Sequence, residues 1–155
     1  MFARAASCDV TPSRPVRLAG YVARKAPTST VLDPLEIAAL LLESEERRCL
    51  ILSFDLMLVG SELEALITSR LQPLGFADDE VMLLASHTHT APATDRACAH
   101  MGSPDGDFVE IAADAAVGLV RRMLQQRPAP VSIDIISGAL DGTAGGERMV
   151  WAGRP

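Results

Sequence analysis

The stretch from Cys49 to His87 reads as strand, helix and strand, and this order constrains the fold more than any other feature. The apolar run CLILSFD ends at Asp55 and is followed by SELEALITSRLQPLG, in which Ser61 and Glu64 have the spacing of a capping box. VMLLASH then has the nearly all-apolar composition of a strand buried on both faces of a sheet. Because right-handed crossovers place two such strands in parallel, we expect Asp55 and His87 to lie close together at one end of the sheet.

The other predicted elements complete a mixed sheet. FARAASCDV is strand-like, residues 11–33 form a long loop punctuated by proline and glycine, and LEIAALLLES with RRCLILSFDLML predicts a β-hairpin. Asp107 and Glu110 indicate the cap of a second helix, which ends before Pro128. Its expected buried stripe is Val109, Ala112, Ala116, Val120 and Met123 or Leu124. VSIDIIS and, more weakly, RMVWAG follow as strands.

The order β-β-β-α-β-α-β-β predicts an α/β fold, a mixed β-sheet with two main helices packed on it. The chain has 155 residues, of which 48% are hydrophobic, and it contains no low-complexity tract. A chain of this size buries most of its apolar surface in one core. We therefore expect residues 1–155 to form a single domain.

Charge and apolar runs exclude several classes of partner. The 14 basic and 20 acidic residues give a net charge of −6, and no cluster of basic and aromatic residues suggests a nucleic-acid partner. The longest apolar stretch, IAALLLE, is far shorter than the roughly 20 residues of a membrane helix, so we expect no transmembrane segment. The start of the chain lacks the apolar region of a secretory signal. Cys8, Cys49 and Cys98 are widely spaced, which favours a cytoplasmic protein with idle thiols.

The main candidate for chemistry is LASHTHTAP, in which His87 and His89 follow a predicted buried strand. Alternate residues of a strand point to one face, so we expect the two imidazoles within about 6 Å of each other, facing one metal ion. Two other interpretations remain open for a bare His-x-His pair, a satisfied core histidine or two loop residues. An HxHxDH site is excluded because Ala91 and Pro92 stand where aspartate and histidine are needed. No serine lies in a GxSxG motif.

A catalytic zinc needs a third protein ligand besides these two histidines. No spacing identifies that ligand, and the local candidates are Asp55, Asp95, Cys98, His100 and Asp105. Asp55 is polar at the end of an apolar strand, where it must be hydrogen-bonded or paired. It is therefore either a structural cap or a residue of the site.

Several motifs together resemble a known family. They are CDVTP, LAGYVAR, LDPLEIAALLLES, CLILSFDLMLVGSELEALI and VMLLASHTHTAP, followed by a glycine-rich turn with an arginine. In this order they resemble the N-terminal domain of the neutral/alkaline non-lysosomal ceramidases. The resemblance runs from about Ala3 to Arg148 and covers only the first part of that family's catalytic domain.

The resemblance implies a zinc-dependent amidase that cleaves the N-acyl bond of ceramide into a fatty acid and sphingosine. It implies that His87 is a zinc ligand and that His89 lies beside it, holding or polarising the reacting groups. Arg148 in GGERM is the nearest match to a family arginine and would stabilise the oxyanion, although Glu147 replaces the family's asparagine. The family's other ligands lie further downstream than this chain extends, and Tyr21 is its only tyrosine.

Two functions follow as hypotheses. The first is a metal-dependent, ceramidase-like hydrolase of an N-acyl amide, with Zn²⁺ as cofactor and a small-molecule or lipid-like amide as substrate. The second is a truncated, non-catalytic ceramidase-like domain that serves as a binding or assembly module; an unrelated small-molecule-binding domain ranks third. Two imidazoles alone would hold zinc weakly. Two explanations remain open. The simpler one is that the site is incomplete in a truncated or compact relative; the other is that residues such as Asp55, Asp95 or His100 complete it, from the same chain or across a symmetric interface.

A truncated sheet would also expose an edge strand and an apolar patch. Such surfaces tend to be covered by another polypeptide. We therefore expect a homo-oligomer, most simply a two-fold dimer.

Overall fold

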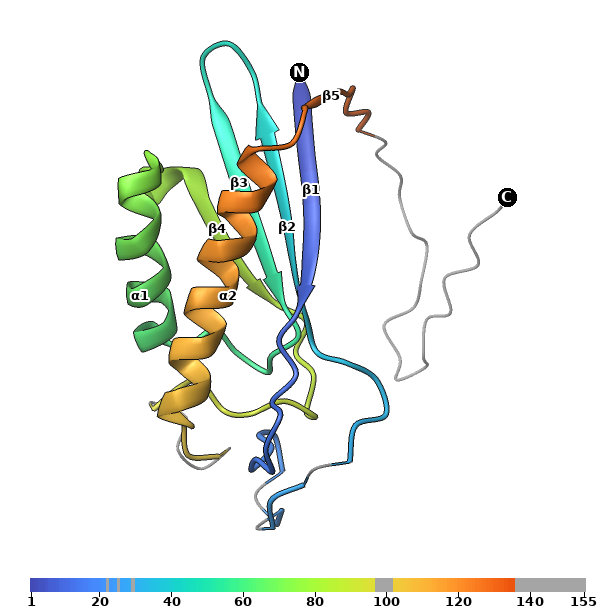
Figure 1. Cartoon of the computed structure of the whole chain (residues 1–155), viewed down its shortest axis with the longest axis vertical. Coiled ribbons are helices and arrows are strands. Elements are labelled where there is room, and N and C mark those ends of the chain that lie inside the picture. Colours follow the sequence, from blue (N-terminus) through green and yellow to red (C-terminus); the bar gives the residue numbers. More distant parts are fainter. Residues whose placement is uncertain (22, 25, 29, 97–101, 136–155) are drawn as a thin grey trace, which may run out of the picture.

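The computed structural model describes residues 1–135 apart from residues 22, 25, 29 and 97–101. Its five strands form one mixed sheet in the order β4-β3-β2-β1-β5 (Figure 1). The strands are β1 (Phe2–Asp9), β2 (Glu36–Glu43), β3 (Arg48–Phe54), β4 (Val81–Ala85) and β5 (Ala129–Pro130). The helices are α1 (Ser61–Leu71) and α2 (Gly106–Leu124), with short 3-10 turns η1 (Gln72–Leu74) and η2 (Asp78–Glu80). The predicted α/β class and the element order through β5 are confirmed.

The predicted β-hairpin and the parallel strand pair are both present. β2 and β3 are antiparallel, with Glu43 opposite Arg48 at the turn. β3 and β4 are parallel neighbours, with Phe54 opposite Ala85 at their carboxyl ends. The connection between them contains α1, in agreement with the crossover that parallel strands need. The ends of the two strands that lead to Asp55 and His87 therefore meet at one end of the sheet.

The prediction that the VMLLASH strand is buried on both faces is wrong. β4 is an edge strand of the described sheet, and the side chains of Met82 and Leu84 are 48% and 44% exposed. Val81, Leu83 and Ala85 alternate with them and are partly buried on the helix side. An all-apolar strand does not by itself reveal whether a layer covers its second face.

Both helices start one or two positions before the predicted caps. Gly60 is the N-cap of α1 and has no side chain to cap with, so the capping box of Ser61 and Glu64 is not formed. Asp105, not Asp107, caps α2, and its carboxylate accepts a hydrogen bond from the backbone N–H of Phe108. The buried stripe of α2 was predicted correctly and includes Val109, Ala112, Ala116, Val120 and Met123.

The strand after α2 differs from the prediction. Its two residues, Ala129 and Pro130, pair with β1, whereas residues 131–135 carry no strand. The N–H of Val131 donates to the carbonyl oxygen of Met1 at 3.1 Å, which extends this short pairing by one hydrogen bond. The predicted last strand, RMVWAG, lies outside the described residues.

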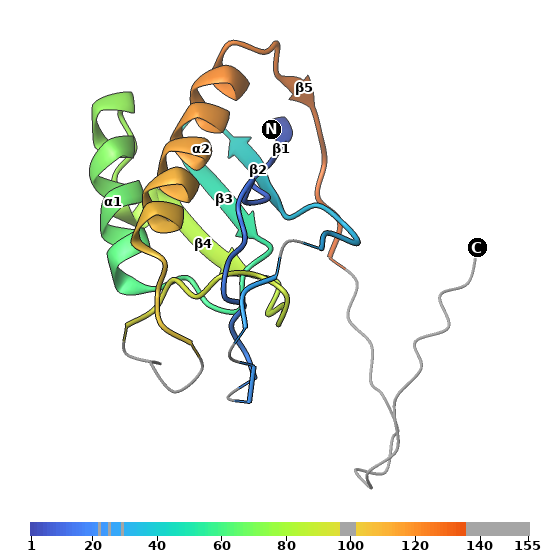
Figure 2. The same cartoon turned by 60° about the horizontal axis from the view of Figure 1, so that its bottom comes forward.

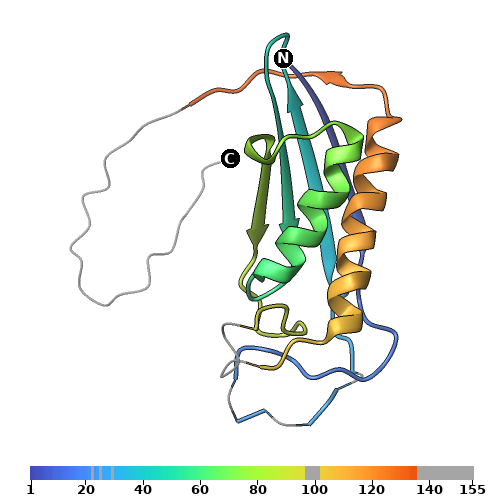
Figure 3. The same ribbon diagram turned by 90° about the vertical axis from the view of Figure 1, so that its left-hand side faces the viewer.

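Two layers make up the described fold. Both helices lie on one face of the sheet, and turning the molecule shows the same side of the strands covered (Figures 2 and 3). The core between the layers includes Ile37, Leu41, Leu50, Leu52 and Phe54 from the sheet and Leu63, Ile67, Phe108, Leu119 and Met123 from the helices. No described helix covers the opposite face.

None of the helices in this part of the chain combines the length and apolar character that crossing a bilayer requires.

Two loops gather at the carboxyl ends of β3 and β4. Residues 11–33, as far as they are described, carry no regular element and are held by isolated bridges between Val16 and Thr28 and between Leu18 and Pro92. The second loop follows β4 and contains the histidine pair. Both loops lie beyond the strands at the end where α2 begins (Figure 3).

Candidate functional site

The end of β4 carries the histidine pair out of the sheet. The N–H of Ser86 donates to the carbonyl oxygen of Phe54 at 2.9 Å, which continues the parallel pairing by one residue. His87 then leaves the strand with φ of 61°, in the left-handed region that a non-glycine residue rarely adopts. The histidines are therefore not alternate residues of a strand, and the geometric reason given for their convergence is wrong.

The two imidazoles nevertheless lie side by side. Their ring centroids are 5.1 Å apart with an angle of 74° between the planes, within the predicted 6 Å. The Nδ1 atom of His87 lies 2.9 Å from the carbonyl oxygen of Met57. Because a carbonyl oxygen only accepts hydrogen bonds, this contact assigns a proton to Nδ1, and in the neutral imidazole Nε2 then has the lone pair. A histidine held in this way is ready to bind a metal through Nε2.

His89 is packed more tightly than His87. Its ring meets Tyr21 edge-on, with centroids 5.0 Å apart, and it lies directly against Gly20. A Cβ atom added to Gly20 would fall 2.5 Å from Cγ of His89, and Gly20 has φ of +97°, so only glycine fits there. The Nδ1 atom of His89 is buried and has no hydrogen-bond partner among the described residues.

Arg24 completes the support of His89. One of its terminal nitrogens donates to the carbonyl oxygen of His89 at 2.7 Å, and its guanidinium lies 4.9 Å from the centre of the Tyr21 ring. Sequence reasoning did not assign a role to Gly20, Tyr21 or Arg24. The available signal was the motif LAGYVAR within a long loop, because long loops in compact domains are often functional.

Asp55 is engaged as a structural cap. Its carboxylate accepts a hydrogen bond from the N–H of Glu36 at 3.0 Å, and its own N–H donates to the carbonyl oxygen of Glu36 at 3.0 Å. These two bonds join the start of β2 to the end of β3. The sequence left two interpretations open for Asp55, a structural cap or a residue of the site. The hydrogen bonds in the structure are those of a structural cap.

Asp95 lies in the segment that runs from the histidine pair toward α2. The preceding Thr94 is buried, and its hydroxyl donates to the carbonyl oxygen of Leu58 at 2.6 Å. The following Arg96 pairs with Glu62 of α1 at 2.7 Å, and this hydrogen bond lowers the pKa of the Glu62 carboxyl. These contacts hold Asp95 beside the first turn of α1.

The remaining candidates do not join the pair in the described structure. Asp105 caps α2 and pairs with Arg14 at 2.6 Å. Cys98, His100 and Arg148 lie outside the described residues. Within residues 1–135, apart from the gaps named above, no three histidine, cysteine, aspartate or glutamate side chains are grouped so that they could hold a metal ion.

The residues present fit part of a zinc site. His87 has the fixed tautomer and the backbone-carbonyl partner that are usual for zinc-binding histidines. The imidazole of His89 lies beside it, with an unpartnered nitrogen. Zinc sites in hydrolases use three protein ligands and leave a fourth position for water. The described donors therefore supply at most two of the three ligands.

Comparison with known proteins shows which structures the fold resembles, and it does not show an activity. No protein-family model matches the sequence, and no curated protein matches it. The structure is similar to that of a neutral ceramidase from Pseudomonas aeruginosa, with a TM-score of 0.73 and 21% identity over 83% of this chain. The fold is ceramidase-like. A structure described as a ceramidase complexed with C2 gives a TM-score of 0.71, with the same identity and coverage. The chain spans 22% of the length of each of these proteins.

Proposed function

We propose that this chain carries the histidine pair of a zinc-dependent hydrolase that cleaves an N-acyl amide, as a ceramidase does. The observation that carries the proposal is the hydrogen bond between Nδ1 of His87 and the carbonyl oxygen of Met57, beside the ring of His89. The ceramidase-like fold supports the same conclusion. The amide would be a small molecule or a lipid.

The proposed roles of the two histidines differ. His87 would hold zinc through Nε2, because its other nitrogen is committed to Met57. His89 would face the reacting groups from a fixed position, because Gly20, Tyr21 and Arg24 hold its ring and backbone. Bound zinc would supply Lewis-acid activation of water and of the amide carbonyl. Arg148 would stabilise the developing oxyanion.

Zinc binding tests the proposal directly. The affinity for zinc would be measured by competition with a chromogenic chelator for the native chain, His87→Ala and His89→Ala. Loss of a ligand should weaken zinc binding by at least about tenfold, since even losing a partner of a ligand costs 10- to 100-fold. Cys49→Ser is the matched control, because this half-buried thiol lies at the opposite end of β3. Equal zinc affinity in the native chain and the histidine variants would contradict the proposal.

Hydrolysis separates this function from a second one. A fluorogenic N-acyl amide would be assayed with the zinc-loaded chain and after removal of zinc with EDTA. The second candidate is a non-catalytic binding or assembly module, and it is favoured by the lack of a third metal donor near the pair in the described residues. Zinc binding without zinc-dependent hydrolysis would support that module and contradict the enzyme.

We also propose that the chain associates with a second copy of itself through the sheet face that no described helix covers. Ala5, Leu40, Ile51 and Met82 are paired across four strands in one row of this face. In this row β1 carries a small side chain, Ala5, and β4 carries a large one, Met82. A two-fold axis parallel to the strands would place β1 of one copy opposite β4 of the other, so that large side chains would meet small ones. Solvent-exposed sheet faces normally carry polar residues in such rows.

A further inference from the structure

Thr94 is a polar residue that is buried, with only 3% of its surface exposed. Its hydroxyl donates a hydrogen bond to the carbonyl oxygen of Leu58 at 2.6 Å. Burying a hydroxyl is costly unless it is hydrogen-bonded, so this bond holds the Thr94 side chain in one orientation. The bond joins the segment after the histidine pair to the connection between β3 and α1.

The acceptor of this bond lies next to the partner of His87. Met57 directly precedes Leu58, and its carbonyl oxygen lies 2.9 Å from Nδ1 of His87. The two carbonyl groups belong to neighbouring planar peptide units, which turn relative to each other only through the backbone angles of Leu58. A bond that holds the Leu58 carbonyl therefore limits the directions in which the Met57 carbonyl can point.

Close packing holds the same two segments together. A Cβ atom added to Gly60 would fall 2.6 Å from the carbonyl carbon of Thr94, so the two backbones are in direct contact. The side chain of Met57 is buried in a small apolar cluster with Ala19 and Ala93. The Thr94 hydroxyl therefore meets the Leu58 carbonyl at a junction where neither segment has room to shift.

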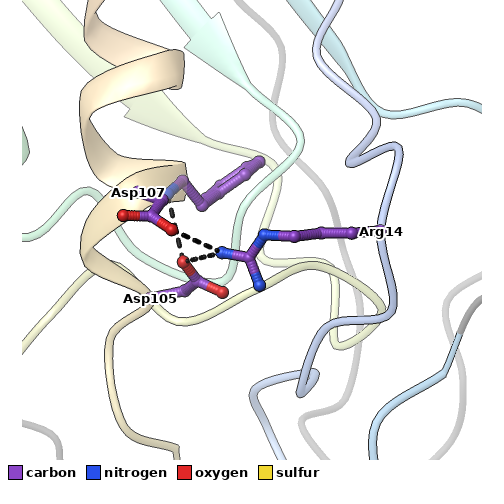
Figure 4. Close-up of polar contacts among 4 residues, drawn as sticks. Arg14, Asp105 and Asp107 are labelled. Carbon is purple, nitrogen blue, oxygen red and sulfur yellow. Dashed lines mark hydrogen bonds and ion pairs between the residues drawn. The ribbon is translucent and has the colours of Figure 1, made fainter.

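The segment that carries Thr94 is also anchored on its other side. The N–H of Asp105 donates to the carbonyl oxygen of Ala93 at 3.3 Å. Asp105 is itself fixed, because its carboxylate caps α2 and lies 2.6 Å from a terminal nitrogen of Arg14 (Figure 4). The support of the Met57 carbonyl thus extends through Thr94 to the start of α2.

His87 needs such support because its backbone is strained. Its φ of 61° lies in the left-handed region, which persists for a non-glycine residue only where surrounding contacts hold it. His87 is also exposed, so water would replace the Met57 carbonyl at Nδ1 if that carbonyl turned away. A neutral imidazole carries one proton on either nitrogen, and the hydrogen-bond partner decides which. The tautomer of His87 therefore depends on where the Met57 carbonyl points.

We infer that Thr94 is a positioning residue, whose hydroxyl directs the Met57 carbonyl at Nδ1 of His87 and so leaves the lone pair of Nε2 for a metal ion. The metal part of this inference rests on the proposed function, whereas the tautomer is a property of the zinc-free chain. Removing the partner of a metal-binding histidine weakens metal binding roughly 10- to 100-fold. Thr94 acts one step further from the metal, so its loss should weaken zinc binding by about tenfold, the lower end of that range.

The tautomer is measured without zinc. ¹⁵N NMR of the imidazole nitrogens would be recorded in EDTA at about pH 8, where a histidine with an ordinary pKa of about 6.5 is neutral. Native His87 should carry its proton on Nδ1. Thr94→Val replaces the hydroxyl by a methyl group of similar size and should move the proton toward Nε2, whereas Thr94→Ser keeps the hydroxyl and should restore the native spectrum. Thr68→Val is the matched control, because the Thr68 hydroxyl also donates to a backbone carbonyl, that of Glu64 at 2.9 Å, but within α1.

Circular dichroism shows whether each variant is folded. If Thr94→Val does not fold, Thr94→Ala removes the same hydroxyl without adding a methyl group in its place. A folded variant that lacks the hydroxyl and still carries the proton on Nδ1 of His87 would overturn the inference, because Thr94 would then contribute only to stability. Native His87 with its proton on Nε2 would overturn it as well. If the native chain bound no zinc, the proposed function would fail, and the NMR spectra would still decide the role of Thr94.

Discussion

Gly20 shows how a single residue controls the candidate site. It combines a left-handed backbone with direct contact to the His89 ring, and either feature alone disfavours a side chain. Neither feature is visible in the motif LAGYVAR. Such positions occur where a loop must approach a functional group closely, which agrees with the place of Gly20 beside the histidine pair.

Gly20→Ala should destabilise the fold and displace His89. The expected loss is about 1 to 3 kcal/mol in the free energy of unfolding, from backbone strain together with the clash against the ring. Urea denaturation measures the loss, and zinc affinity reports the displacement. Gly106→Ala is the control, because an added Cβ there meets nothing within 4 Å and should change stability by no more than about 1 kcal/mol. Equal stability of the Gly20→Ala variant and the native chain would contradict the strain argument.

At the scale of elements, the N-cap residue of α2 links the helix to the loop of residues 11–33. Asp105 both caps the helix and pairs with Arg14, whereas the side chain of Asp107 is 84% exposed. Exposed ion pairs contribute little to stability, so the cap should stabilise the fold more than the ion pairs do. Loss of the Asp105 side chain would remove both the cap of α2 and its ion pair with the loop of residues 11–33.

Asp105→Ala is expected to lower the free energy of unfolding by about 0.5 to 2 kcal/mol, the usual effect of removing an N-cap. Asp105→Asn separates the two roles, because asparagine caps as well as aspartate but loses the charge that attracts Arg14. We expect nearly native stability for Asp105→Asn in urea denaturation. If the asparagine variant were as unstable as the alanine variant, the ion pair rather than the cap would be the main contribution.

A second link between elements depends on pH. The guanidinium of Arg48 holds both carboxylate oxygens of Glu80, at 3.0 and 2.9 Å, and joins the start of β3 to the turn before β4. The hydrogen bond from Arg48, followed by that from the N–H of Ala77, lowers the pKa of the Glu80 carboxyl from its usual 4.5. A carboxyl whose pKa is lowered by folding stabilises the fold above its unfolded pKa. That stabilisation is lost as pH falls through the folded value.

The midpoint of urea unfolding should therefore fall as the pH drops from about 5 into the range below the usual carboxyl pKa. Glu80→Gln should show a smaller fall, since its side chain cannot be protonated in this range. Asp79→Asn is the control, because it removes a neighbouring exposed carboxylate without touching Arg48. An identical pH dependence in the native chain and Glu80→Gln would show that this pair does not contribute.

At the scale of the whole molecule, the helices cover one face of the sheet, and no described helix covers the other face. The helices bury one set of alternate residues, while Leu40, Ile51, Met82 and Leu84 on the other side face no described helix. The ceramidase structures that share this fold are far longer, since the match covers 22% of them. An apolar face of this kind calls for a covering layer, and a second copy of the chain is the layer proposed above.

The double variant Met82→Glu, Leu84→Glu tests that layer. Both side chains are already about half exposed, so the monomer should keep its fold, whereas two charges in a dimer interface should weaken association by about 100-fold or more. Light scattering coupled to size exclusion measures the mass. Ile111→Glu is the control, because the side chain of Ile111 is 56% exposed and lies on α2, on the helix side of the sheet. Association of this variant should be unchanged. A native chain that is already monomeric would refute the proposed association.

The sequence by itself determined the order of the main elements, the parallel strand pair and the position of the candidate site. Apolar periodicity in β3, α1 and β4, together with the handedness of crossovers, required the parallel pair and so placed the His87 segment beside Asp55. The buried stripe of α2 followed from its period in the same way. These features could be predicted because buried side chains recur with the period of the helix or strand that carries them. That period is visible in the spacing of apolar residues within each segment.

Only the tertiary structure decided the details that give the site its chemistry. The cap of α1 fell on Gly60 instead of Ser61, and the proton on His87 was fixed by the carbonyl of Met57, thirty positions earlier in the chain. The packing of His89 against Gly20 joins two loops that share no periodic pattern. Contacts of this kind depend on loop conformations and on backbone groups that every residue carries, so residue type and spacing do not encode them.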